Sequence, residues 1–417
     1  MKAEFIRSTG LLLAVLLCCE GSPAQAAKGP GFVTVSGVVK DRSSKKALEY
    51  VNISVLGTSI GTVTNTDGGF SIKVGDSIPE ATLEISHLGY RSQRYPIQGG
   101  NVEDVVILLI PNANTLPEIV VRAMDPLKLV ENAIARIAEN NSARHTLLTG
   151  FYRETIKKRR NYISVTEAIV NVYKTPYTDN VERDRVQVYK GRQLLSPKTS
   201  DTLAVKLQGG PNIAIFLDAV KNHDLLLDAR TLRDYTFRME TPVMLDQRPH
   251  YAVSFEPAAI QPYPLFYGTM YIDQETLTFA RIEFGFSMKD SNKVTNTILR
   301  KKPLNLRFKP EEISYLVTYK QENGVSYLNY IRNVIRFRCD WKRRLFSTGY
   351  TVVSEMVATD KQLDNVVAIP YKLAFNIRNV LSDKVSSFYD EDFWEGYNII
   401  APTESLESAV NRLKKKY

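Results

Sequence analysis

The chain has 417 residues, of which 44% are hydrophobic and 24% charged, a composition that supports packed cores and excludes an intrinsically disordered chain. Its length is sufficient for two or three domains. The 54 basic and 45 acidic residues give a net charge of +9. That modest excess fits contact with an anionic surface, and it equally fits basic side chains spread over exposed sheet faces.

The N-terminus has the pattern of a secretory signal peptide at residues 1–26. Two basic residues precede an apolar run at 11–19, which is too short to span a bilayer, and an Ala-Gln-Ala cleavage site ends at Ala26. Lipidation of Cys18 or Cys19 is the alternative interpretation. It is less favoured because neither cysteine follows the small residue that a lipoprotein signal requires.

Export changes what is expected of the remaining chain. Cys339 is then the one cysteine left, so no internal disulfide is expected, and its place in an apolar, alternating segment predicts a buried thiol. The expected location is the periplasm or the outer membrane, where nucleic acid is not an expected partner.

Residues 31–111 predict a small β-sandwich. Short apolar segments, most of them alternating with polar residues, are separated by turn residues, which is typical of antiparallel sheets. The candidate strands are residues 32–39, 51–55, 70–74, 83–85 and 105–110.

The segment GTVTNTDGGFSIKV (Gly61–Val74) in this domain invites interpretation as a metal loop. A calcium loop of EF-hand type requires an oxygen ligand at Val63 and an acidic residue at Val74, so that interpretation fails at both positions. The motif GTSIG at residues 57–61 matches G-x-S-x-G, but a nucleophile elbow needs a strand-to-helix turn, and strands are expected on both sides. We interpret Asp67-Gly68 as an ordinary turn pair.

Several of these features together resemble the carboxypeptidase-regulatory-like domain, a module common in exported proteins of Bacteroidota-type bacteria. The matching stretches are Gly37-x-Val39, residues 47–52, GTVTNTDGGF at residues 61–70, and Leu88-Gly89-Tyr90. The resemblance implies a seven-stranded, transthyretin-like Greek-key sandwich without catalytic residues. A zinc carboxypeptidase is excluded, because none of the four histidines is followed three residues later by an acidic ligand and no H-E-x-x-H motif occurs.

The remaining chain predicts a linker, a large α+β domain and a final helix, so that the fold class is mainly β. The linker is residues 112–124, and its sequence NTLPEIVVRA resembles the segment that follows the same sandwich in TonB-dependent outer-membrane receptors. Residues 125–400 predict a helix that begins at Asp125-Pro126, followed by a curved antiparallel sheet. Residues 401–417 predict an amphipathic helix with acidic residues first and basic residues last.

Within the large domain, hairpin turns are expected at Asn323-Gly324 and at residues 273–276, and a helical stretch between Thr199 and His223. Alternation after Gly324 places Tyr327, Ile331, Ile335, Phe337, Cys339 and Trp341 on one face, opposite Tyr330, Arg332, Val334, Arg336 and Arg338. Residues 249–287 resemble the curved half-barrels of periplasmic lipoprotein carriers, which hold an acyl chain against the concave face. The aromatic face is then either an ordinary core or a ligand groove.

Two basic clusters are candidate contacts for an anionic surface such as a glycan or a lipid headgroup. The alternative is that they keep hairpin ends soluble and protect them from edge pairing. The candidate residues are Lys157, Lys158, Arg159, Arg160, Arg336, Arg338, Lys342, Arg343 and Arg344.

The sequence therefore favours a non-enzymatic exported protein of the cell envelope whose second domain binds an envelope protein, a lipid or glycan, or another apolar ligand. An accessory role in TonB-dependent transport or envelope biogenesis is one alternative, and peripheral membrane contact is compatible with either. A carboxylate-based hydrolase is another, because residues 390–395 (DEDFWE) group acids beside aromatics; catalysis, however, requires carboxylates held across a bond. No cofactor or metal is expected, and the oligomeric state is left open.

Overall fold

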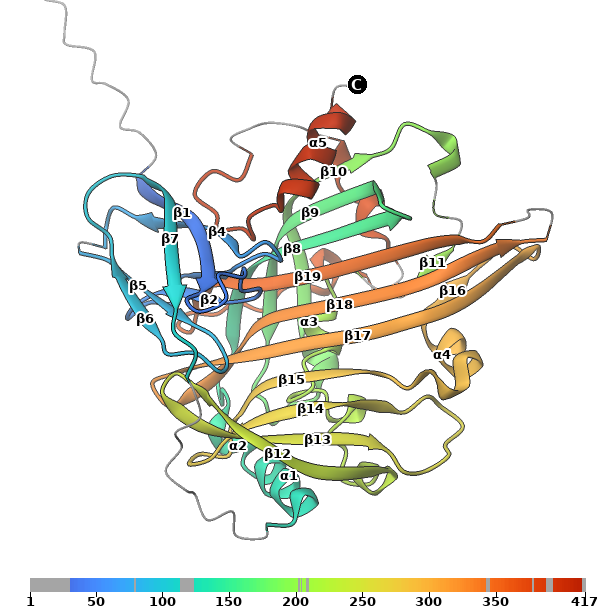
Figure 1. Cartoon of the computed structure of the whole chain (residues 1–417), viewed down its shortest axis with the longest axis horizontal. Coiled ribbons are helices and arrows are strands. Elements are labelled where there is room, and N and C mark those ends of the chain that lie inside the picture. Colours follow the sequence, from blue (N-terminus) through green and yellow to red (C-terminus); the bar gives the residue numbers. More distant parts are fainter. Residues whose placement is uncertain are drawn as a thin grey trace, which may run out of the picture.

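The computed structural model describes residues 31–112 and 124–414, apart from residues 79, 202, 204, 208–209, 343–345, 377–378 and 388–392. The described chain forms a small N-terminal β-domain set against one side of a much larger sheet (Figure 1). The expected signal peptide and most of the expected linker lie outside the described residues. Within the described part of the chain, no helix is long and apolar enough to serve as a membrane span.

The N-terminal domain contains seven strands in two sheets, which confirms the predicted sandwich. One sheet has the order β4-β1-β7 and the other β3-β2-β5-β6, and apolar side chains from both fill one core. The strands are β1 (Phe32–Asp41), β2 (Asn52–Val55), β3 (Gly61–Val63), β4 (Gly69–Gly75), β5 (Thr82–Ser86), β6 (Gln93–Pro96) and β7 (Val102–Leu109).

The second domain is built on one open sheet of eleven strands in the order β12-β13-β14-β15-β17-β18-β19-β8-β9-β10-β20. Neighbours are antiparallel except for the two-residue β20. The strands are β8 (Thr146–Lys158), β9 (Asn161–Lys174), β10 (Arg185–Leu195), β12 (Tyr235–Leu245), β13 (Arg248–Pro257), β14 (Phe266–Asp273), β15 (Phe279–Phe286), β17 (Leu306–Glu322), β18 (Val325–Trp341), β19 (Thr348–Gln362) and β20 (Ser386–Ser387). A separate pair joins β11 (Lys206–Leu207) to β16 (Leu299–Lys301).

The helices are short and lie around the sheet. The side chain of Asp125 caps the first helix, as its sequence predicts, by accepting from the amide of Leu127. Between Thr199 and His223, where a helical stretch interrupted at residues 209–211 is expected, the described residues form only short helical pieces at Thr199–Asp201 and Ile213–Phe216. The α-helices are α1 (Pro126–Ala135), α2 (Ile137–Asn140), α3 (Ile213–Phe216), α4 (Ser291–Ile298) and α5 (Glu404–Lys414), and the 3₁₀ turns are Val181–Arg183, Thr199–Asp201, His223–Leu225, Leu232–Asp234, Met288–Asp290, Tyr371–Leu373 and Leu381–Asp383.

The long hairpin of β17 and β18 forms at the predicted turn, where Asn323 and Gly324 have φ angles of 50° and 82°. The register shifts shortly after the turn, from Tyr319 opposite Leu328 to Thr318 opposite Tyr330. This bulge sends Tyr327 to the face opposite Ile331, so the sequence-based assignment of Tyr327 is wrong.

The large sheet has two unlike faces. We call the face that carries Tyr152, Ile331 and Met356 the inner face; it packs on α1, α3 and the loops between β10 and β12. We call the opposite face the outer face; its buried residues, among them Phe151 and Tyr330, pack against the N-terminal domain and the segment of residues 393–402.

A buried ionic cluster fastens the loops that cover the inner face. Lys174 at the end of β9 pairs with Asp218 at 2.8 Å, and Lys221 pairs with Asp184 at 2.6 Å. The hydroxyl of Tyr319 on β17 donates to Asp218 at 2.8 Å. These long-range pairs hold the segment around α3, which its short helical turns alone would not do.

Candidate functional site

A cavity of about 390 Å³ lies between the inner face and the loops that cover it. Its walls are mostly apolar and include Ile156 on β8, Ile335 on β18 and Val352 on β19. Leu203 and Leu381 contribute from the covering loops. The volume lies within the range of cavities that hold small ligands.

Three polar side chains form a row along the wall of this inner cavity. Ser354 on β19 lies opposite Glu154 on β8 and opposite Asn333 on β18 in the strand register. Glu154 accepts hydrogen bonds from the hydroxyl of Tyr152 at 3.0 Å and from the hydroxyl of Ser354 at 3.4 Å. The row adds hydrogen-bonding groups to a chamber that is mostly apolar and whose lining also includes Asp201, Arg300 and Asn379.

The protein does not fully offset the cost of burying the side chains of Glu154 and Asn333. Burial raises the pKa of Glu154, and its two hydroxyl donors only partly oppose that effect. Asn333 is 5% exposed, and its side-chain oxygen accepts no hydrogen bond from any described residue. A buried acceptor without a donor is costly, so the oxygen is a position where a ligand donor would be stabilised.

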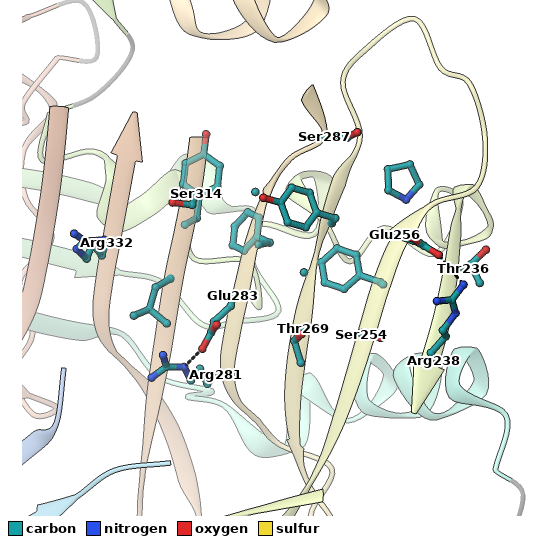
Figure 2. A pocket seen from close by; sticks show the side chains of 18 of the residues that line it. Thr236, Arg238, Ser254, Glu256, Thr269, Arg281, Glu283, Ser287, Ser314 and Arg332 are labelled. Carbon is teal, nitrogen blue, oxygen red and sulfur yellow. Dashed lines mark hydrogen bonds and ion pairs between the residues drawn. The ribbon is translucent and has the colours of Figure 1, made fainter. Parts of the chain in front are cut away.

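A second, larger concavity of about 710 Å³ lies on the outer face, and we call it the outer groove (Figure 2). It crosses β12 to β18 and ends beneath Tyr50 of the N-terminal domain. Figure 2 shows Arg332 and the pair Arg281–Glu283 toward one end, and Arg238 with Glu256 toward the other. The outer groove is thus open and polar, whereas the inner cavity is mostly apolar.

A row of alternating charges crosses the outer face from this groove to the far strands. In register order it runs Arg332, Glu355, Arg153, Glu167 and Arg192. Arg153 pairs with Glu167 at 2.7 Å and with Glu355 at 3.7 Å, and Arg192 pairs with Glu167 at 2.6 Å. Burial by itself would raise the pKa of Glu167, but the two arginines hold it below the ordinary value.

The N-terminal domain and the segment before α5 cover this charge row. Arg153 donates to the carbonyl of Ile400 at 2.8 Å. Asn65, in the loop between β3 and β4, donates to the carbonyls of Ala401 and Pro402 and accepts from the amides of its own turn. Gly68 has a φ of 74°, as a turn glycine requires. The glycine-rich loop is therefore a structural corner that also fastens the C-terminal segment.

The basic residues singled out from the sequence gather at one end of the sheet, where Lys157 and Arg336 lie on either side of Thr351 on β19. Four of the seven described ones have partners. Lys157 lies over Tyr162, Lys158 pairs with Asp201, Arg336 with Glu312 and Arg338 with Glu311, whereas Arg159, Arg160 and Lys342 are exposed. Arg343 and Arg344 lie outside the described residues.

Two other motifs considered in the sequence are the GTSIG segment at residues 57–61 and the acidic segment at residues 390–395. Ser59 of the GTSIG motif lies between two strands, as expected, and its hydroxyl donates to Asp360 on β19. The carboxylates of residues 390–392 lie outside the described residues, so the hydrolase alternative is not tested by their geometry. Among the described residues no group of three or more His, Cys, Asp or Glu side chains is arranged to hold a metal ion.

Comparison with known proteins identifies the N-terminal domain. Residues 35–121 match the family model described as the CarboxypepD_reg-like domain, a non-catalytic module, which confirms the resemblance found in the sequence. Over 87 residues the chain is 38% identical to the TonB-dependent receptor P3 of Formosa agariphila. This match covers 21% of the chain and 8% of the receptor, so it concerns this one domain.

Two solved structures similar to the chain each cover 58% of it. One is a DUF1329 family protein from Desulfovibrio piger, with 12% identity, a TM-score of 0.25 and 95% of its own chain covered. Another is a putative outer membrane lipoprotein-sorting protein domain from Vibrio parahaemolyticus, with 9% identity, a TM-score of 0.25 and 93% covered. The latter is described as a lipoprotein-sorting domain, the kind of protein that residues 249–287 resemble in sequence.

Proposed function

We propose that this protein is a non-enzymatic component of the bacterial envelope whose large sheet domain binds an apolar ligand in the inner cavity. The observation that carries the proposal is the unpartnered, buried oxygen of Asn333 on the wall of an apolar chamber. A ligand with a long apolar part and one hydroxyl or amide group would fill the chamber and donate to that oxygen. Glu154, with its raised pKa, offers a second hydrogen-bonding group on the same wall.

The envelope location is supported by two features. The first 26 residues have the pattern of a signal peptide. The N-terminal domain is of the kind found in a TonB-dependent receptor, which favours an accessory role beside such receptors as the second candidate function. In either role the N-terminal domain is a scaffold that covers the charge row. The exposed Arg159 and Arg160 are proposed contacts for an anionic surface.

A fluorescence titration with dansyl-labelled undecanoic acid tests the inner cavity directly. We expect saturable binding to the unmodified protein and loss of binding in Val352→Trp, because the indole would fill the chamber that Val352 lines. Val353→Trp is the matched control: the next residue points to the outer face, and this variant should bind as the unmodified protein does.

Asn333→Leu separates the polar anchor from the apolar chamber, since it removes the acceptor and keeps a similar volume. We expect it to weaken binding of a dansyl-labelled probe that ends in a hydroxyl, which donates to that oxygen, and to leave binding of the matching methyl ether unchanged. Equal binding by Val352→Trp and the unmodified protein would overturn the proposal.

A further inference from the structure

We propose that the outer groove binds an acidic saccharide and that Arg332 pairs with its acid group. The groove is a different cavity from the inner chamber and lies on the opposite face of the sheet. The inference therefore stands or falls independently of the function proposed above.

Arg332 lines the outer groove at the end of the charge row. Glu355 and Glu49 act on it through their charge. Both glutamates of the row make their closest contacts with other groups. Glu167 is held by Arg153 and Arg192, and Glu355 accepts from the hydroxyl of Tyr330 at 2.9 Å. Arg332 itself donates no hydrogen bond to any described residue.

The ring of Tyr50 fixes this guanidinium at the end of the groove. The central carbon of Arg332 lies 5.2 Å from the ring centroid, a distance suited to a cation–π contact. A half-buried, oriented guanidinium with free N–H groups is suited to a carboxylate or a sulfate, which accepts two parallel hydrogen bonds from it. The charged side chains of the lining agree with this sign, since four are basic and two are acidic (Arg238, Arg281, Lys289 and Arg332 against Glu256 and Glu283).

The remaining lining favours a polyhydroxylated ligand. Serine and threonine side chains from four strands line the groove (Figure 2). The hydroxyl of Ser254 donates to Glu240 and that of Ser314 to Glu312. Two ion pairs, Arg281–Glu283 at 2.5 Å and the more exposed Arg238–Glu256 at 2.8 Å, present planar donors and acceptors that sugar hydroxyls can contact. Tyr267 is 49% exposed beside them, and an exposed ring offers a flat apolar surface to the C–H face of a sugar.

The same geometry disfavours an extended peptide. The floor of the groove is formed by β13, β14, β15 and β17, and each of these strands is already paired on both sides. A peptide laid on these four strands would find no free backbone edge to pair with, and the free edge of the sheet borders the groove only at β12. Side-chain hydroxyls and charges remain, and these are the groups that recognise a saccharide.

Isothermal titration calorimetry with three probes tests this assignment. The probes are a galacturonic acid hexamer, a neutral glucose hexamer and a hexaglutamate peptide, each titrated at low salt into the full chain. We expect the acidic saccharide to bind more tightly than the other two. Hexaglutamate binding as tightly as the uronate, or no binding of the uronate, would overturn the assignment.

Two variants locate the site. Arg332→Gln should weaken uronate binding about ten- to hundredfold, the effect of losing a charged hydrogen-bonding partner. Tyr267→Ala changes an exposed ring, leaves the core intact and should also weaken binding, so the proposal stays testable even if Arg332→Gln folds poorly. Arg336→Gln is the matched control on the same strand and face, and its affinity should be unchanged; unaltered binding in both groove variants would contradict the proposal.

Discussion

The two faces of the large sheet are made by the same strands, yet they solve the problem of burying polar groups in opposite ways. On the outer face, Arg153 and Glu167 are buried but paired, and backbone carbonyls of the C-terminal segment take further donors. On the inner face, Glu154 has a raised pKa and Asn333 has an unpartnered oxygen. The difference indicates that the paired part of the outer row, from Glu355 to Arg192, is structural, and it supports the proposal that the inner row contacts a ligand.

The segments that cover the two faces of the sheet also differ. The N-terminal domain covers the outer charge row. Its residues Thr62 and Asn65 donate hydrogen bonds to backbone carbonyls of the segment of residues 399–402. Loops with only brief helical turns cover the inner face and leave a chamber. A ligand site requires space and unsatisfied groups, and these occur together on the inner face.

Breaking the outer charge row should give the largest effect on stability. Arg153→Met leaves Glu167 and Glu355 buried with too few partners, and we expect a loss of about 3–5 kcal/mol in the free energy of unfolding. Urea denaturation followed by circular dichroism measures it. Arg336→Met removes an exposed ion pair on the same face, and it should lower the free energy of unfolding by less than about 1 kcal/mol. Similar losses in the two variants would show that the row is not structurally distinct.

Loosening the cover of the outer face should give an intermediate effect. Asn65→Ala removes hydrogen bonds to Ala401 and Pro402 and leaves their carbonyls less well satisfied, so we expect a loss of about 1–3 kcal/mol. Hydrogen exchange should also become faster on the N-terminal side of α5. Thr66→Ala, at the exposed neighbouring position, should change neither quantity.

Removing the buried charge of Glu154 from the inner row should give the smallest effect on stability, and this effect should be a gain. Because the folded-state pKa of Glu154 is raised, its ionisation costs stability as the pH rises through that pKa, whereas below its unfolded value the carboxyl is neutral in both states. Glu154→Gln should therefore raise the thermal midpoint at pH 7.5 and leave it unchanged at pH 3.5. Exposed Glu131→Gln serves as the control; a lower midpoint for Glu154→Gln at pH 7.5 would contradict the account.

Much of the fold could be predicted from local patterns. Turn pairs such as Asp67-Gly68 and Asn323-Gly324, with alternation on either side, predicted both the sandwich and the longest hairpin. The bulge that reverses Tyr327 was not predictable from alternation, because one extra residue in a strand leaves no mark in the pattern. The loops around α3 are held by ion pairs such as Lys221 with Asp184. The partners of such a pair lie far apart in the sequence, and no periodic pattern links them.

The site residues were missed for a related reason. Glu154, Asn333 and Ser354 lie on three strands, and only the register brings them together. One signal was present in the sequence: Asn333 stands between Ile331 and Ile335 on the same face, where an apolar residue is expected. A polar residue at such a position is a better pointer to a site than the basic clusters, most of whose described members have partners.

The central claim is that the inner cavity holds an apolar ligand, and native mass spectrometry of the full chain expressed with its own N-terminus tests it most directly. The account predicts a mass above that of the polypeptide, release of an apolar molecule on denaturing extraction, and loss of that molecule in Val352→Trp but not in Val353→Trp. A ligand retained equally by both variants, or a protein that carries none and binds no dansyl-labelled acid, would contradict it.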